Sequence, residues 1–199
     1  MGDETKIIQC ALADTDILLV EDDQATRKVL KLMFEQLGAR VHEAGGQMEA
    51  IGMYIQLYRA KRIPRIVVAD WWLVPKGGPE YQFLSTINSG RNITSIMLLE
   101  TVCKLDEHAF VLCYTNAPED AVAHLSKLRS ASNTAEVVDK SKVTPMAFVE
   151  SVIDHPGIAK QRLERDRLRA VLAKAQEEAD PTEGSGTRML RAVGKKLKD

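Results

Sequence analysis

The sequence has few cysteines and no long hydrophobic run. Its three cysteines are an odd number without the spacing of a metal site. Two of them lie in apolar segments typical of buried thiols, which favours a reducing compartment. No stretch approaches the ~18 consecutive apolar residues that span a membrane. The acidic start, Met1-Gly2-Asp3-Glu4, lacks the basic and then apolar pattern of a signal peptide. We therefore expect a cytoplasmic protein.

A strong charge of either sign is also missing. The formal net charge of −1 gives no whole-molecule field that would attract nucleic acid or an anionic membrane. The hydrophobic fraction of 45% and the charged fraction of 28% are typical of a globular protein with a real core. A length of 199 residues accommodates one sizeable domain and an appendage.

Short apolar runs alternate with segments of helical periodicity along most of the chain. The predicted strands are 17–20, 41–44, 66–69, 110–114 and 136–139. The predicted helices are about 29–37, 47–60, 95–105, 118–130 and 145–153. This alternation predicts a doubly wound α/β fold with a five-stranded parallel sheet. Ligands bind such folds beyond the carboxyl ends of the strands.

Polar residues stand at those strand ends. Glu21 and Asp22 follow the first run, and Asp70 follows the third. Three converging carboxylates repel one another unless a hard, oxygen-preferring cation such as Mg²⁺ binds. Thr115 adds a hydroxyl after the fourth run, and Lys140 adds a point charge that can pair with a phosphoryl oxygen. Together these residues predict a phosphoryl-transfer site.

The stretch Ile17-Leu18-Leu19-Val20-Glu21-Asp22-Asp23, followed by Arg27, Leu30 and Leu37-Gly38, resembles the response-regulator receiver family. The resemblance extends over about residues 15–155. It implies a flavodoxin-like receiver fold that acts as an aspartate-phosphorylated signalling switch. It also implies no enzyme activity beyond the domain's own phosphoryl transfer and hydrolysis.

The resemblance also implies a role for each site residue. Asp70 takes the place of the phosphoacceptor, Thr115 that of the hydroxyl that senses the phosphoryl group, and Lys140 that of the family's lysine. The implied ligands of Mg²⁺ are Glu21, Asp22, Asp70 and the backbone carbonyl of Trp72. The implied partners are a histidine kinase or phosphotransfer protein and a downstream protein target.

Three departures from the family support an alternative function. Pro75 lies five residues after Asp70 instead of the family's usual four, in a segment that is lengthened by an insertion at about residues 76–93. Ser141 follows the lysine where the family has a proline, and Val137 stands at the position of the family's aromatic switch. They favour a degenerate receiver that acts as a phosphorylation-independent interaction scaffold. The intact set of five site residues opposes it.

A metal-dependent enzyme of the topoisomerase–primase type also places acids after buried strands. Such a site is expected to carry Asp-x-Asp after its second acidic strand, whereas Asp70 is followed by Trp71 and Trp72. The near-neutral charge also predicts no basic groove. Both observations argue against this alternative.

The chain flanking the expected receiver is short. Residues 1–14 are interpreted as an N-terminal arm. Residues 156–180 are rich in good helix formers with a narrow apolar stripe, which predicts a helical extension that packs on the receiver or forms a homodimer contact. Residues 181–199 are expected to be a flexible basic tail. No DNA-binding domain is expected, because this length falls below that of a typical domain.

Overall fold

The computed structural model describes residues 11–73, 94–106, 108–128 and 134–156, together with 158–159, 163, 166–167 and 170–171. The expected insertion at 76–93, the basic tail at 181–199 and the first ten residues of the arm lie outside the described residues. The chain divides into two compact units, Met1–Asp154 and His155–Asp199. No helix among the described residues is long and apolar enough to cross a membrane.

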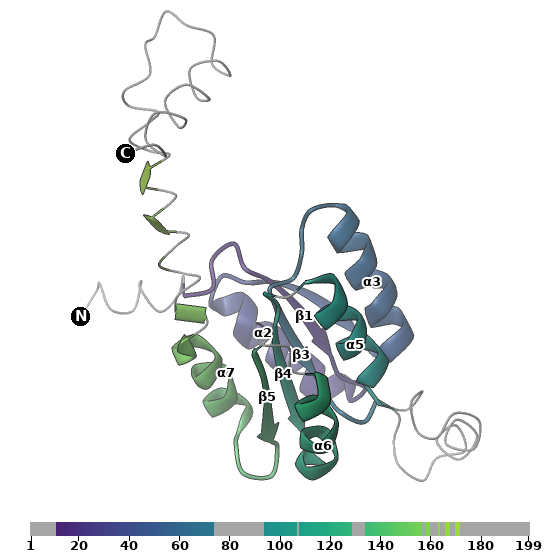
Figure 1. The fold of residues 1–199 in the computed structure, drawn as a ribbon. Coiled ribbons are helices and arrows are strands. Elements are labelled where there is room, and N and C mark those ends of the chain that lie inside the picture. The colour runs from purple at the N-terminus through teal and green to yellow at the C-terminus, as the bar shows by residue number, and fades with distance from the viewer. Residues whose placement is uncertain are drawn as a thin grey trace, which may run out of the picture. The chain divides into compact units, whose positions relative to one another are not determined.

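The first unit is built on one parallel sheet with strand order β2-β1-β3-β4-β5 (Figure 1). The strands are β1 (Asp16–Val20), β2 (Arg40–Ala44), β3 (Ile66–Ala69), β4 (Phe110–Thr115) and β5 (Thr134–Asp139). Every residue of β1, β3 and β4 is buried, as expected for strands covered on both faces. The predicted doubly wound, five-stranded fold is confirmed.

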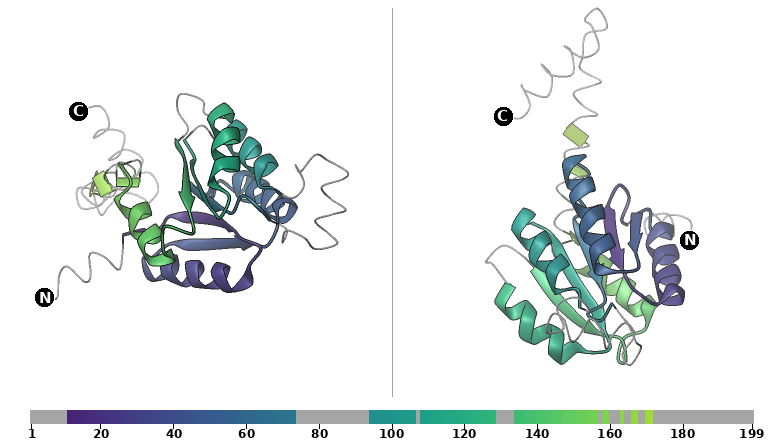
Figure 2. Two further views of the ribbon diagram at one scale, coloured as in Figure 1. Left: turned by 90° about the horizontal axis from the view of Figure 1, so that it is seen from below. Right: turned by 90° about the vertical axis from the view of Figure 1, so that its right-hand side faces the viewer.

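Helices cover both faces of this sheet (Figures 1 and 2). One face carries α2 (Gln24–Gln36) and α7 (Pro145–Asp154), and the other carries α3 (Gln47–Arg59), α5 (Ile96–Leu105) and α6 (Pro118–Leu128). The Asp23 carboxylate caps α2 by accepting a hydrogen bond from Thr26 N at 2.7 Å. Gly38 follows this helix with a φ of +86°, in the left-handed region that favours glycine. Local signals therefore set both ends of the helix that follows the acidic residues.

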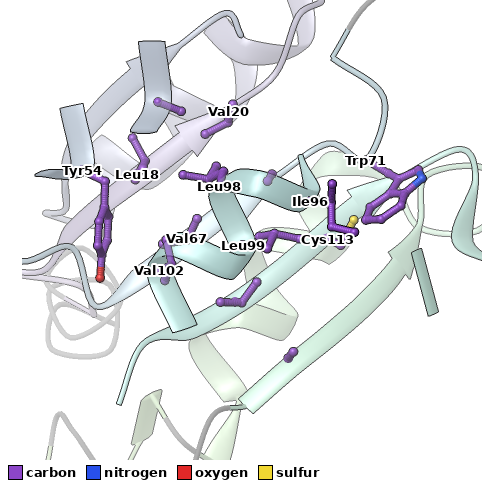
Figure 3. Close-up of a cluster of buried hydrophobic side chains, with 14 of the residues drawn as sticks. Leu18, Val20, Tyr54, Val67, Trp71, Ile96, Leu98, Leu99, Val102 and Cys113 are labelled. Atoms are coloured by element: carbon purple, nitrogen blue, oxygen red, sulfur yellow. The ribbon is translucent and has the colours of Figure 1, made fainter. Parts of the chain in front are cut away.

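Both faces of the sheet bury mainly aliphatic side chains, and one face also holds a column of aromatic rings. Aliphatic residues from β1, β3, β4 and α5 fill the face beneath α3, α5 and α6, with Tyr54 and Trp71 toward opposite ends of the cluster (Figure 3). The other face also buries aliphatic residues, among them Ile17, Leu19 and Ile66. On this face Phe34 of α2 lies edge-on to Phe148 of α7, with centroids 6.4 Å apart, and Phe148 stacks on Tyr114 of β4. These three rings form an aromatic column between the sheet and the two helices.

A buried carboxylate stands at the edge of the sheet opposite the predicted site. Asp16, at the start of β1, is only 7% exposed. Its oxygens accept hydrogen bonds from Arg40 Nη2 at 2.7 Å and Arg62 Nη2 at 3.3 Å, and one lies 2.7 Å from His42 Nε2. Burial raises the pKa of Asp16, but the hydrogen bonds and positive charge of Arg40 and His42 outweigh it and leave the pKa below its usual value. The charged form of Asp16 therefore stabilises the fold.

Replacing Asp16 tests this contribution. A carboxyl group whose pKa is lowered by folding contributes its full stabilisation above its pKa in the unfolded chain, which is about 3.9. This stabilisation is lost as the pH falls through the lower pKa of the group in the folded protein. We expect Asp16→Asn to lower the free energy of unfolding at neutral pH by about 1–2 kcal/mol, as for hydrogen bonds to a charged group with partly exposed partners. Urea unfolding at neutral and strongly acidic pH measures it. An equal difference between wild type and variant at both pH values would contradict the assignment.

Candidate functional site

Three acidic side chains meet at the carboxyl edge of the sheet. Glu21 and Asp22 directly follow β1, and Asp70 directly follows β3. These strands are neighbours with Val20 opposite Ala69, and Asp70 N donates a hydrogen bond to Val20 O at 2.8 Å. One carboxylate oxygen from each acid lies within 4.8 Å of the others. The structure thus brings together the three acids that the sequence predicts.

Lys140 completes this cluster from the far strand of the sheet. It follows β5, and its Nζ donates to Glu21 Oε2 and to Asp70 Oδ2, each at 2.6 Å. All three side chains are largely buried, and short charge-assisted hydrogen bonds of this kind are among the stronger polar contacts in proteins. The ammonium therefore bridges two carboxylates that come from different strands.

Thr115 is fully buried at the end of β4. Its backbone carbonyl accepts a hydrogen bond from Lys140 N at 2.9 Å, and its Oγ1 accepts one from Ala117 N at 3.1 Å. The hydroxyl is therefore held at the same edge of the sheet as the lysine. The structure thus places all five predicted side chains at the carboxyl ends of β1, β3, β4 and β5.

The electrostatics of the cluster follow from burial and crowding. Burial raises the pKa of Glu21 to about 7, with Asp70 adding to the effect and Lys140 opposing it. Burial and the neighbouring Asp70 also raise the pKa of Asp22. Burial alone lowers the pKa of Lys140, but the Asp70 and Glu21 carboxylates more than compensate and raise it. Three carboxylates facing one ammonium leave excess negative charge in a small volume.

The donor set fits a hard divalent cation. Asp70 Oδ1 is buried and has no hydrogen-bond partner among the described residues, although a buried carboxylate oxygen normally has one. Carboxylate oxygens at this spacing are the ligands that Mg²⁺ and Ca²⁺ prefer. The unpartnered oxygen and the crowded acids both favour a bound cation. The roles of the individual residues as ligands stay predictions.

Arg27 supports the acidic loop in a way that the sequence did not reveal. Its guanidinium Nη1, projecting from α2, donates to the backbone carbonyl of Glu21 and, at 3.4 Å, to that of Asp22. The position of Arg27 after the acidic residues was part of the family resemblance, but an arginine in a helix is usually a solvated surface residue. Its contact with the loop therefore needed the structure.

The two tryptophans after Asp70 have different surroundings. Trp71 is 2% exposed, belongs to the aliphatic cluster and stacks on His124 of α6, with centroids 5.3 Å apart. Trp72 is partly buried and forms an isolated antiparallel bridge with Thr94, while Ser95 N donates to Trp71 O at 2.9 Å. The chain therefore leaves and rejoins the described structure at adjacent points beside Asp70. The role of the Trp72 carbonyl as a metal ligand stays a prediction.

No model of a protein family matches this sequence. No curated protein matches it either.

Solved structures show a clear likeness of fold. A CheY-like response regulator receiver domain protein from Methanospirillum hungatei JF-1 superposes with a TM-score of 0.51 at 20% identity, over 75% of this chain and 98% of that chain. A response regulator receiver domain protein from Clostridium thermocellum gives a TM-score of 0.50 at 17% identity, over 75% and 98%. The receiver domain of the histidine kinase CKI1 from Arabidopsis thaliana, complexed with Mg²⁺ and BeF3⁻, gives a TM-score of 0.50 at 13% identity, over 75% of this chain and 96% of that chain. The predicted receiver fold is confirmed.

Replacing Asp22 tests the cation site. Its carboxylate is half-buried and is repelled by Asp70. Without divalent cations, we expect Asp22→Asn to raise the free energy of unfolding by up to about 1 kcal/mol, because it removes one of three crowded charges. With saturating Mg²⁺ we expect wild type to be more stable than the variant. Binding of Mg²⁺ at a concentration a hundredfold above its Kd adds about 3 kcal/mol to the free energy of unfolding of wild type, and the variant gains less.

Thermal unfolding in EDTA and in excess Mg²⁺ measures both effects. An equal gain of stability from Mg²⁺ in wild type and Asp22→Asn would contradict a cation site at this cluster.

Proposed function

We propose that residues 15–155 form a phosphorylatable receiver domain, with Asp70 as phosphoacceptor, in a two-component response regulator. The observation that carries this proposal is the contact of Lys140 with both Glu21 and Asp70 at the carboxyl edge of a receiver fold. Parallel α/β sheets bind ligands at this edge. The phosphoryl donor would be a phosphohistidine on a histidine kinase or phosphotransfer protein.

The reaction is a transfer to a carboxylate. A carboxylate oxygen of Asp70 attacks phosphorus while the phosphorus–nitrogen bond of the donor breaks, and the leaving imidazole keeps the electron pair and takes up a proton. The product is an acyl phosphate on Asp70. A divalent cation held by Glu21, Asp22 and Asp70 would neutralise charge on the phosphoryl oxygens.

Lys140 and Thr115 then have distinct tasks. The ammonium of Lys140 already lies 2.6 Å from Asp70 Oδ2, so a phosphoryl oxygen bound to Asp70 comes within its reach. The Thr115 hydroxyl, at the end of β4, can donate a hydrogen bond to a second phosphoryl oxygen. Both residues would hold the product in one orientation, and the change in their contacts would start the signal.

The signal would pass through protein–protein contacts. The histidine kinase and the downstream target are expected partners. The described residues between 156 and 171 are helical, apart from the gaps given above, and this segment stays a predicted homodimer contact. A cytoplasmic location also stays a prediction.

A phosphorylation-independent interaction scaffold is the second candidate. One feature of the described residues favours it. Val137 packs against the aliphatic cluster at the position where the family has its aromatic switch. A scaffold of this kind would keep the fold and the ion pairs but would not accept phosphate.

Intact-protein mass after incubation with acetyl phosphate and Mg²⁺ separates the two candidates. We expect wild type to gain one phosphoryl group and Asp70→Asn to gain none, because the amide is a poor nucleophile. Asp23→Asn is the matched control, because Asp23 is the adjacent acid of the same loop but is exposed and caps α2. It should be phosphorylated like wild type.

Two results would contradict the phosphoacceptor. Phosphate gain that persists in Asp70→Asn would place the acceptor elsewhere. No gain in wild type or Asp23→Asn, together with no stabilisation by Mg²⁺, would favour the scaffold.

A further inference from the structure

Tyr114 lies directly beneath the lysine of the site. It precedes Thr115 in β4 and therefore projects from the opposite face of the sheet, where it is only 3% exposed. Its hydroxyl donates a hydrogen bond to Val143 O at 2.9 Å. Its ring stacks on Phe148 of α7, with centroids 4.3 Å apart and an interplanar angle of 12°. The side chain thus contacts both the loop after β5 and the helix that follows it.

The same ring also lies close to the lysine ammonium. Lys140 Nζ is 5.4 Å from the centroid of the Tyr114 ring, within the range of cation–π attraction. That Nζ is the atom that donates to Glu21 and Asp70. The Tyr114 ring therefore faces the charged end of the lysine, while its hydroxyl binds the loop that carries the lysine.

The lysine loop is tied first to the strand that it follows. Lys142 N and Val143 N both donate to Asp139 O, and Ser141 N and Oγ donate to Asp139 Oδ1 at 2.9 and 2.7 Å. Because Asp139 is the last residue of β5, these bonds shape the turn and attach it to the end of that strand.

Among the described residues, two further hydrogen bonds join this turn to the neighbouring strand, β4. Lys140 N donates to Thr115 O at the start of the turn, and Tyr114 Oη donates to Val143 O near its end. The first bond holds the start of the turn against β4, and the second holds its end against the same strand. The hydroxyl of Tyr114 is therefore the side-chain group that attaches the end of the turn to β4.

We propose that Tyr114 is a positioning residue for Lys140. Its hydroxyl anchors the loop at Val143, and its ring supports the ammonium from below, so that Nζ stays aimed at the carboxyl of Asp70. The catalytic part of this inference rests on the proposed phosphorylation of Asp70, because the lysine would act on the phosphoryl group. Preorganised contacts of this kind matter because a displacement of about 1 Å can cost about a hundredfold in rate.

A tyrosine that only fills space gives a different expectation. The ring alone would then account for its presence, and phenylalanine would serve equally well in the aromatic column. Tyr114→Phe keeps the stack on Phe148 and removes the hydrogen bond to Val143 O. This variant therefore separates anchoring from packing.

Tyr54 provides the matched control. It is fully buried in α3, and its hydroxyl has no hydrogen-bond partner among the described residues. Tyr54→Phe makes the same chemical change in the aliphatic cluster, on the other face of the sheet. A general effect of removing a buried hydroxyl should appear in both variants, and an effect on the lysine loop only in Tyr114→Phe.

The first measurement is amide hydrogen exchange of Lys140, Lys142 and Val143 by NMR, without metal or phosphoryl donor. We expect Tyr114→Phe to speed exchange at these amides several-fold, because the turn loses its second attachment to β4. Tyr54→Phe should match wild type there. Unchanged exchange in Tyr114→Phe would overturn the anchoring role.

The second measurement is the rate constant of phosphorylation at saturating acetyl phosphate, with Mg²⁺ affinity measured separately. We expect Tyr114→Phe to lower the rate constant about tenfold, less than the loss for a full 1 Å displacement. Mg²⁺ is kept saturating for each protein, because Lys140 contacts Glu21 and Asp70, two of the acids that would bind the cation. A purely structural role predicts a lower Tm with an unchanged rate constant.

The two measurements separate the two proposals. If wild type accepts no phosphate, the proposed function fails, and the exchange data still decide whether Tyr114 anchors the lysine loop. If the exchange rises but the phosphorylation rate is unchanged, the positioning of Lys140 by Tyr114 is overturned while the phosphorylation of Asp70 stands.

Discussion

The ammonium of Lys140 holds together two buried carboxylates that would otherwise repel each other. Its partner Glu21 is 119 residues away in the sequence and its partner Asp70 is 70 residues away. Burying three charged groups is costly unless each has a partner, so this contact requires β1, β3 and β5 to end at one edge of the sheet in the right register. The strand order places these three strand ends in one sheet, and the helices on both faces hold the strands in position. The site can exist only once the whole sheet has formed.

The sequence predicted the sheet and the site because both depend on local patterns. Strands covered on both faces are continuous apolar runs in the sequence. A parallel sheet brings the carboxyl ends of its strands to one edge, so the sequence alone predicts that Glu21, Asp70 and Lys140 lie near one another. The strand ends were less well predicted. Asp16, Arg40 and Thr134 belong to strands although they are polar, because backbone pairing extends beyond the apolar core.

Other parts of the site depend on contacts that no local pattern contains. The bond from Arg27 to the acidic loop depends on how α2 lies against β1, and the bond from Tyr114 to Val143 depends on how the β5–α7 turn folds over β4. In the sequence these are an ordinary helical arginine and an ordinary strand tyrosine. Ser141 shows the same limit. Where the family has a proline, Ser141 closes a turn by donating hydrogen bonds to Asp139, and the described residues contain no cis peptide.

The bridge between Trp72 and Thr94 has a consequence for how the chain can change. The hydrogen bond from Ser95 N to Trp71 O holds the two ends of the intervening segment next to each other. The entropy of closing such a loop grows only slowly with its length. A segment of different size or sequence can therefore be exchanged there as a module. Recombination or protein engineering could give the domain a new recognition element within a few residues of Asp70, while leaving the sheet intact.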